Sequence, residues 1–167
     1  MFQGCTNLTS IPELPATTLA ESCYYGMFNY CSSLTTPPTL PATTLEKRCY
    51  AYMFGNCSSL TSAPALPVTA LTESCYDCMF FKCVSLTTAP ELPAEKMVHR
   101  CYYYMFAYCS SLNYIKCLAN SGFEEEYTTV GWVNTVSSSG TFIKNQSASG
   151  WIVGDNGIPE YWTVQVA

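Results

Sequence analysis

A unit of 26 residues recurs along most of this chain and constrains its fold more than any other feature. The dipeptide Met-Phe begins at Met1, Met27, Met53, Met79 and Met105. A Cys follows each of these Met residues by four positions, and a Cys-Tyr pair recurs with the same period at Cys23, Cys49, Cys75 and Cys101. A fixed period of this length predicts stacked coils, because one unit is too small to bury its own apolar face.

The second half of each unit has the spacing of an amphipathic helix. Apolar residues recur at intervals of four, in one unit at Leu45, Cys49, Met53 and Cys57. Thr43 and Glu46, just before this stripe, have the spacing of a capping box. We therefore predict one helix in the second half of each unit.

The first half of each unit predicts a short strand. It is rich in Thr and ends in Pro, which limits a strand to about three or four residues because Pro cannot donate to a ladder. Stacking then predicts a buried apolar row at Leu8, Leu34, Leu60, Leu86 and Leu112. It also predicts an exposed polar row at Thr9, Thr35, Thr61, Thr87 and Asn113. The predicted fold class is an α/β solenoid of about five strand–helix coils with a parallel sheet, over residues 1–118.

The pattern changes after Leu112, and residues 119–167 are predicted to form a small α+β cap. Residues 113–118 lack the Pro of the other units, so this strand can run longer. Residues 123–136 keep a helical spacing, and residues 140–144 and 161–166 are strand-like, which predicts a helix followed by a β-hairpin. This segment holds all three Trp residues and is expected to cover the open end of the core.

Composition and charge exclude several classes of protein. A hydrophobic content of 49% supplies a core, so disorder is not expected. The net charge of -5 argues against a nucleic-acid partner, and no apolar run is long enough for membrane insertion.

Met1 and Phe2 have the repeat phase of Met27 and Phe28, so we expect that further repeats and any export signal lie upstream.

The repeat resembles a known family. The motif MFxxCxSL, followed by a Pro- and Leu-bearing segment, LPATTL and CY, is similar to the BspA-like leucine-rich repeats of gut and oral bacterial surface proteins, over residues 1 to about 118. The tail, from GWVNTVSSSGTFIKN to NGIPEYWTVQ, resembles the C-terminal module that often follows such repeats in Bacteroides-type proteins. The unit is a few residues longer than is usual in the family. The resemblance implies a secreted or cell-surface protein with a role in adhesion or protein binding, and it supplies no catalytic residues.

The eleven cysteines do not form an obvious catalytic or metal-binding pattern. Nine of them recur at fixed phases on the apolar stripe, so we expect free thiols packed in the core. Cys78 stands with Cys75 in a CxxC arrangement, but there is no second such motif to complete a zinc site. Cys117 is expected to face the core beneath the cap, and His99, the only histidine, is expected on the surface. We expect no cofactor, no bound metal and no enzymatic activity, with a thiol- or metal-dependent enzyme as the remote alternative.

Two surfaces are candidates for ligand binding. The first is an aromatic strip at positions that vary between repeats: Tyr25, Tyr30, Tyr52, Tyr103, Tyr104 and Tyr108. The second is the sheet face with Thr35, Thr61, Thr87, Asn113 and Tyr114. Exposed aromatic rings suit a sugar or a protein partner. The alternative is that the rings pack across neighbouring coils and expose only their hydroxyls.

The expected function is that of a non-enzymatic extracellular binding or adhesion module of a bacterial surface protein, with a protein or glycan ligand. A structural spacer that has no ligand of its own is the alternative. The sequence leaves the identity of the ligand, the anchoring mode and the oligomeric state open.

Overall fold

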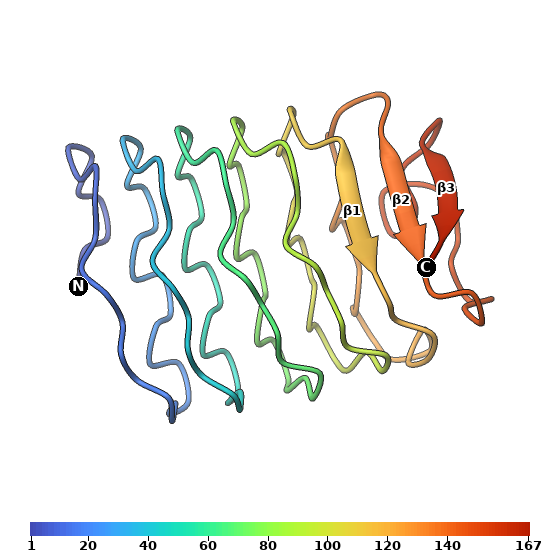
Figure 1. The fold of residues 1–167 in the computed structure, drawn as a ribbon, viewed down its shortest axis with the longest axis horizontal. Helices are drawn as coiled ribbons and strands as arrows, with labels where there is room; N and C mark the ends of the chain where they lie inside the picture. Colours follow the sequence, from blue (N-terminus) through green and yellow to red (C-terminus); the bar gives the residue numbers. More distant parts are fainter.

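The computed structural model describes residues 1–167 as a row of coils stacked along one axis, with the two termini at opposite ends (Figure 1). It contains three strands: β1 (Tyr114–Cys117), β2 (Thr141–Lys144) and β3 (Thr163–Val166). They form one parallel sheet in the order β1-β2-β3 near the C-terminal end. No helix of the structure has the length and apolar character needed to cross a membrane.

The predicted α/β solenoid of strand–helix coils is wrong, because the coils contain no helix. Residues 21–30, 47–56, 73–82 and 99–108 form runs of turns instead, which we call the turn ribbons. Within a ribbon, alternate N–H groups donate to the next coil, as Tyr24 does to the Cys49 carbonyl at 3.0 Å. The intervening groups donate three residues back, as Met27 does to the Tyr24 carbonyl at 3.2 Å. From the second residue of each ribbon onward, each N–H therefore has a partner without the bond to the fourth preceding residue that defines an α-helix.

The backbone of each ribbon repeats every four residues. A positive φ recurs at this interval, in one ribbon at Arg48, Tyr52 and Asn56. In an α-helix, residues four apart are rotated by about 40° from one another, so an apolar stripe of strict period four drifts off one face. The stripe from Leu45 to Cys57 stays buried in the ribbon because the backbone has the same period as the sequence. The predicted capping box at Thr43 and Glu46 precedes turns and caps no helix.

The close spacing of the coils explains why turns replace helices. Equivalent rings in neighbouring coils stack at 5.8 Å for Phe28 and Phe54 and at 6.1 Å for Tyr50 and Tyr76. A helix with its side chains is about 10–12 Å wide and does not fit into a stack with this spacing. The ladder of hydrogen bonds between coils therefore determines the conformation of this half of the unit.

The other half of the unit is extended, but only the last of these segments is a regular strand. One strand in each repeat was predicted, whereas the earlier segments make at most isolated bridges, such as Thr88 with Tyr114. Pro38, Pro64 and Pro90 occupy equivalent positions and remove ladder donors from neighbouring coils. The prediction of a longer strand after residue 112 is confirmed by β1.

The leucine row and two columns of aromatic rings form the core. Four leucines of the row are fully buried and Leu8 is half-buried. The Phe column runs from Phe2 to Phe106 and the Tyr column from Tyr24 to Tyr102. Trp132 ends both columns, with ring centroids 6.1 Å from Phe106 and 6.0 Å from Tyr102. The predicted polar row is exposed in every coil.

The C-terminal segment continues the stack instead of forming the predicted helix and hairpin. Residues 123–135 are another run of turns and bends, with a positive φ at Tyr127, Gly131 and Thr135. The strands β2 and β3 pair in parallel, whereas a hairpin would make them antiparallel. Each strand returns to the sheet after one further circuit of the coil, so both must run in the direction of β1.

All eleven cysteines are free thiols, and nine of them are buried. Cys5 and Cys23, in the first coil, are exposed, which corrects the expectation for these two members of the recurring series. The Cys57 thiol donates to the Phe28 carbonyl at 3.1 Å, and the same bond recurs in the neighbouring coils. Cys117 is fully buried, as predicted.

Candidate functional site

A polar hollow of about 270 Å³ lies on the outer side of three consecutive turn ribbons. We call it the charged hollow. No apolar residue lines it, and its lining consists of Lys47, Arg48, Glu73, Ser74, Asp77, His99 and Arg100.

The stacking of coils brings these side chains together. Lys47, Glu73 and His99 share one repeat phase, and each lies 26 residues from the next. Arg48, Ser74 and Arg100 share the following phase with the same spacing. This site was not predicted from the sequence, although charged residues that recur in phase on neighbouring coils were the signal that could have revealed it.

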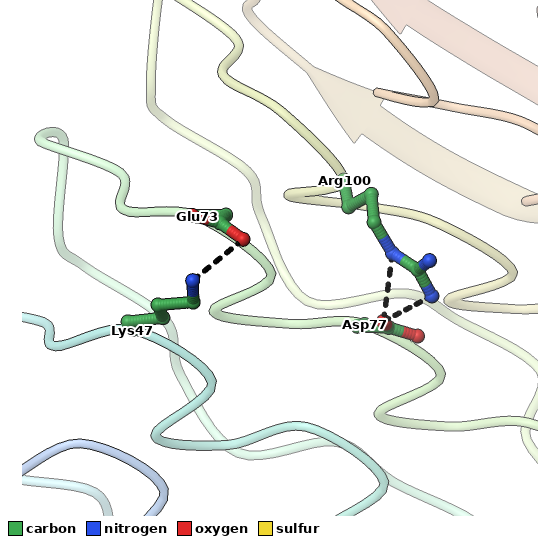
Figure 2. A network of polar contacts seen from close by, with 4 residues as sticks. All are labelled: Lys47, Glu73, Asp77 and Arg100. Atoms are coloured by element: carbon green, nitrogen blue, oxygen red, sulfur yellow. Dashed lines mark hydrogen bonds and ion pairs between the residues drawn. The ribbon is translucent and has the colours of Figure 1, made fainter.

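Two ion pairs cross the hollow (Figure 2). Both carboxylates come from one coil, while Lys47 reaches from the preceding coil and Arg100 from the following one. The Lys47 ammonium lies 2.9 Å from Glu73 Oε1. Arg100 donates to Asp77 Oδ2 twice, at 2.8 Å from Nη2 and at 3.2 Å from Nε. The pairs therefore tie three coils together and fix the walls of the hollow.

Arg48 is the one cation of the hollow that has no ion-pair partner. The Lys47 ammonium, hydrogen-bonded to Glu73, lowers the pKa of that carboxyl below its ordinary 4.5. Partial burial opposes the charge of Arg100, but the Asp77 carboxylate raises the pKa of Arg100 above its ordinary value. Arg48 forms no ion pair, and the buried Oδ1 of Asp77 has no hydrogen-bond partner.

Tyrosine rings flank the hollow on two sides. The Arg48 guanidinium lies over the Tyr25 ring at 5.0 Å, and Tyr25 in turn contacts Tyr52 at 5.7 Å. On the other side, the Arg100 guanidinium lies over the Tyr103 ring at 4.0 Å, and Tyr103 contacts Tyr104 at 4.7 Å. Four of the six predicted tyrosines are thus gathered around charged residues that the prediction did not include.

The other two predicted tyrosines lie apart from the charged hollow. Tyr30 is exposed and Tyr108 is partly covered by Phe81 and Lys82. Tyr104 packs over Gly131 so closely that a Cβ at that glycine would lie 2.6 Å from its ring. Tyr104 therefore packs across neighbouring coils, as the alternative prediction had it. Tyr25 and Tyr30 instead present large exposed surfaces.

The predicted sheet-face site offers few groups that can hold a ligand. Thr35, Thr61, Thr87 and Asn113 are exposed in one row, and Tyr114 is half-buried in β1. A hollow of about 280 Å³ between two coils includes Thr61 and Thr87. Its lining has no charged or aromatic residue, so recognition there would depend on hydroxyl and backbone groups alone.

The thiols near the charged hollow do not have the environment of reactive cysteines. Cys75 and Cys78 are both buried, and burial raises the pKa of each thiol well above its ordinary value. Reactive cysteines instead have a lowered pKa and access to solvent. His99 lies against the edge of the Tyr127 ring at 5.9 Å, and no group of His, Cys, Asp and Glu side chains is arranged to hold a metal ion.

The resemblance to BspA-like surface proteins stays a prediction after comparison with known proteins. No protein-family model, curated protein or solved structure matches this chain.

Proposed function

We propose that this chain is a non-enzymatic binding module of an extracellular or surface-attached bacterial protein, with its ligand held in the charged hollow. The observation that carries the proposal is the gathering of polar groups at one place. Three of the seven basic residues and the only histidine line this hollow. Only 11% of the chain is charged, so this concentration is unusual for its surface.

The hollow is supported as a binding site by the rigidity of its walls. Its residues project from turn ribbons whose backbone groups are hydrogen-bonded to the coils on either side. The two hydrogen bonds from Arg100 to the buried Asp77 hold Arg100 in place before any ligand arrives. A site that is ordered in advance loses less conformational entropy on binding.

A structural spacer is the second candidate. The uninterrupted stacking of the Phe rings, with interplanar angles of 7–15°, favours it, because a regular stack makes a stiff rod. A spacer has no need of a polar hollow, so the two candidates differ in whether the folded chain captures a ligand.

A binding screen with surface variants tests the proposal. The folded chain is immobilised and exposed to mucin glycans and to extracellular-matrix proteins. We expect saturable binding that weakens about tenfold in Tyr25→Ser and in Tyr103→Ser, because aromatic rings at the edge of a site often contribute most of the binding energy. Tyr30→Ser and Tyr108→Ser, which lie away from the hollow, are the matched controls and should bind as the parent does.

The melting temperature of each variant separates lost contact from lost folding. The Tyr25 variant should melt close to the parent, since Tyr25 is 46% exposed and loses only its surface contacts with Arg48 and Tyr52. Absence of binding to any of these ligands would favour the spacer. An equal loss of affinity in the control variants would show that the ligand binds outside the hollow.

A further inference from the structure

The charged hollow is too small and too polar to form a stable protein interface by itself. A stable protein interface buries about 800 Å² on each partner and has an apolar centre. The hollow measures about 270 Å³ and has no apolar lining. It suits a small, strongly hydrated ligand that is held mainly by hydrogen bonds.

The charge of the hollow selects an anionic ligand. Its lysine and two arginines face two carboxylates, and each carboxylate is already paired. Arg48 remains unpaired, with its guanidinium placed over Tyr25. A guanidinium presents parallel N–H donors that match an oxyanion. This local excess of positive charge stands on a chain whose net charge is -5, so it is a specific feature of this place.

The remaining groups suit the hydroxyls of a sugar. Glu73 is half-exposed and has acceptor capacity beyond its bond to Lys47. Ser74 and His99 add groups that can donate or accept, and Arg100 has an Nη1 that is not used in its bonds to Asp77. Donors and acceptors that alternate around a small hollow match the ring of hydroxyls on a sugar. The exposed Tyr25 ring, which lies against Arg48, offers an apolar surface to the C–H face of that sugar.

We propose that the charged hollow binds a sugar ring that carries an anionic group, with Arg48 as the partner of the anion and the Glu73 side as the partner of the hydroxyls. The inference rests on the proposed binding function and narrows it to acidic glycans. The anionic group is a carboxylate, as in a uronic acid, or a sulfate. Both present a pair of oxygens that can accept from the parallel N–H donors of Arg48.

Titration calorimetry with three oligosaccharides of equal length tests the proposal. The probes are a hyaluronan tetrasaccharide, which carries carboxylates, a chondroitin sulfate tetrasaccharide, which carries both groups, and the neutral N-acetylchitotetraose. We expect binding of at least one charged probe at least about tenfold tighter than that of the neutral probe, because hydrogen bonds to charged groups contribute more than neutral ones. Binding of both charged probes indicates a carboxylate ligand, and binding of the chondroitin sulfate alone indicates sulfate.

Two charge-removing variants locate the site. Arg48→Gln should weaken binding of the charged probe about tenfold or more. Lys82→Gln is the matched control, because Lys82 is also an exposed cation at a positive φ over tyrosine and phenylalanine rings, outside the hollow. It should change binding by less than about twofold, since exposed charges at a distance are screened.

The outcomes distinguish this inference from the proposed function. Equal affinity for the neutral and charged probes, or an unchanged affinity in Arg48→Gln, would overturn the inference. Failure of all three probes, together with protein capture that depends on Tyr25 and Tyr103, would overturn only the acidic-glycan inference. Failure of every ligand would overturn the proposed function as well. The melting temperature of Arg48→Gln serves as the folding control.

Discussion

Buried thiols link neighbouring coils at the scale of single residues. A thiol is small enough for the stack and is a weak donor. Cys57 and Cys83 donate to carbonyls of Phe28 and Phe54 that also accept from the ribbon of their own coil. Serine would form a similar bond but would bury a more polar group in the same place. The sequence predicted that these cysteines are free and buried, because their phase coincides with that of the apolar stripe.

The buried thiols predict that stability falls in alkali. Burial raises the pKa of Cys57, Cys101 and Cys109 from an ordinary 9.0 to about 12. The unfolded chain loses these protons from about pH 9, whereas the folded chain keeps them, so the stabilising effect is complete below pH 9 and is lost as the pH rises toward 12. Each such thiol should lower the free energy of unfolding by about 1.4 kcal/mol per pH unit in this window.

Urea denaturation under reducing conditions at about pH 8 and about pH 10 measures this effect. Cys78→Gly is a useful control, because the equivalent residue of the first coil is Gly26. This variant should reduce the slope of the free energy of unfolding against pH by the contribution of one thiol. A free energy of unfolding that is unchanged over this range would show that the thiols are accessible in the folded chain.

At the scale of the element, the turn ribbon replaces a helix because of what it does between coils. A helix satisfies its own backbone groups and is too wide for this spacing. The ribbon donates every second N–H to the next coil and so joins coils at the distance of stacked rings. The cost is a left-handed backbone at every fourth residue, which is about 1–2 kcal/mol for a residue other than glycine. Gly26 and Gly131 occupy two of these positions.

Two substitutions in one ribbon should have effects opposite to those in a helix. Gly26 has a φ of +57°, and a Cβ there would meet only Asn29 Cβ at 3.9 Å, so Gly26→Ala should lower stability by about 1 kcal/mol through the backbone alone. Ser22 has the same φ and no side-chain hydrogen bond, so Ser22→Gly should leave stability unchanged or raise it. In a helix, Gly→Ala would gain about 1 kcal/mol and Ser→Gly would lose about 0.5 kcal/mol.

Thermal and urea denaturation of the two variants measures these changes. Stabilisation by Gly26→Ala together with destabilisation by Ser22→Gly would contradict the turn ribbon and support a helix in this segment.

The elements could be predicted only where local sequence decides them. The absence of proline after Leu112 predicted β1, and proline at Pro38, Pro64 and Pro90 predicted that the other extended segments would be short. The helices were wrong because a spacing of four was interpreted as 3.6, and hydrogen bonds between coils outweigh the local preference. The hairpin was wrong because the return path of the chain, rather than its turn residues, sets the direction of β3.

At the scale of the whole molecule, the stack is a set of continuous columns with one end closed. Trp132 ends both aromatic columns and stacks on Trp151 at 5.4 Å, while its Nε1 donates to the Gly157 carbonyl at 2.8 Å. The predicted role of the C-terminal tryptophans as a cover for the core is therefore consistent with this packing. Repetition predicted the columns directly, because equivalent residues of neighbouring coils must lie side by side.

The candidate site could be predicted only in part. The varying tyrosine positions Tyr25 and Tyr103 lie beside arginines of the charged hollow, although their face of the coil was expected on helices. The charged residues of the hollow were not found, because Lys47, Glu73 and Arg100 lie far apart in sequence and their contact depends on the stacking distance. The site thus exists only in the assembled stack.

Far-UV circular dichroism of the purified chain shows whether its 26-residue coils stack without helices. We expect a spectrum without the paired minima of an α-helix, lost in one cooperative transition on heating. A helical spectrum with a contribution from each repeat would contradict the turn ribbons, and with them the charged hollow that they form.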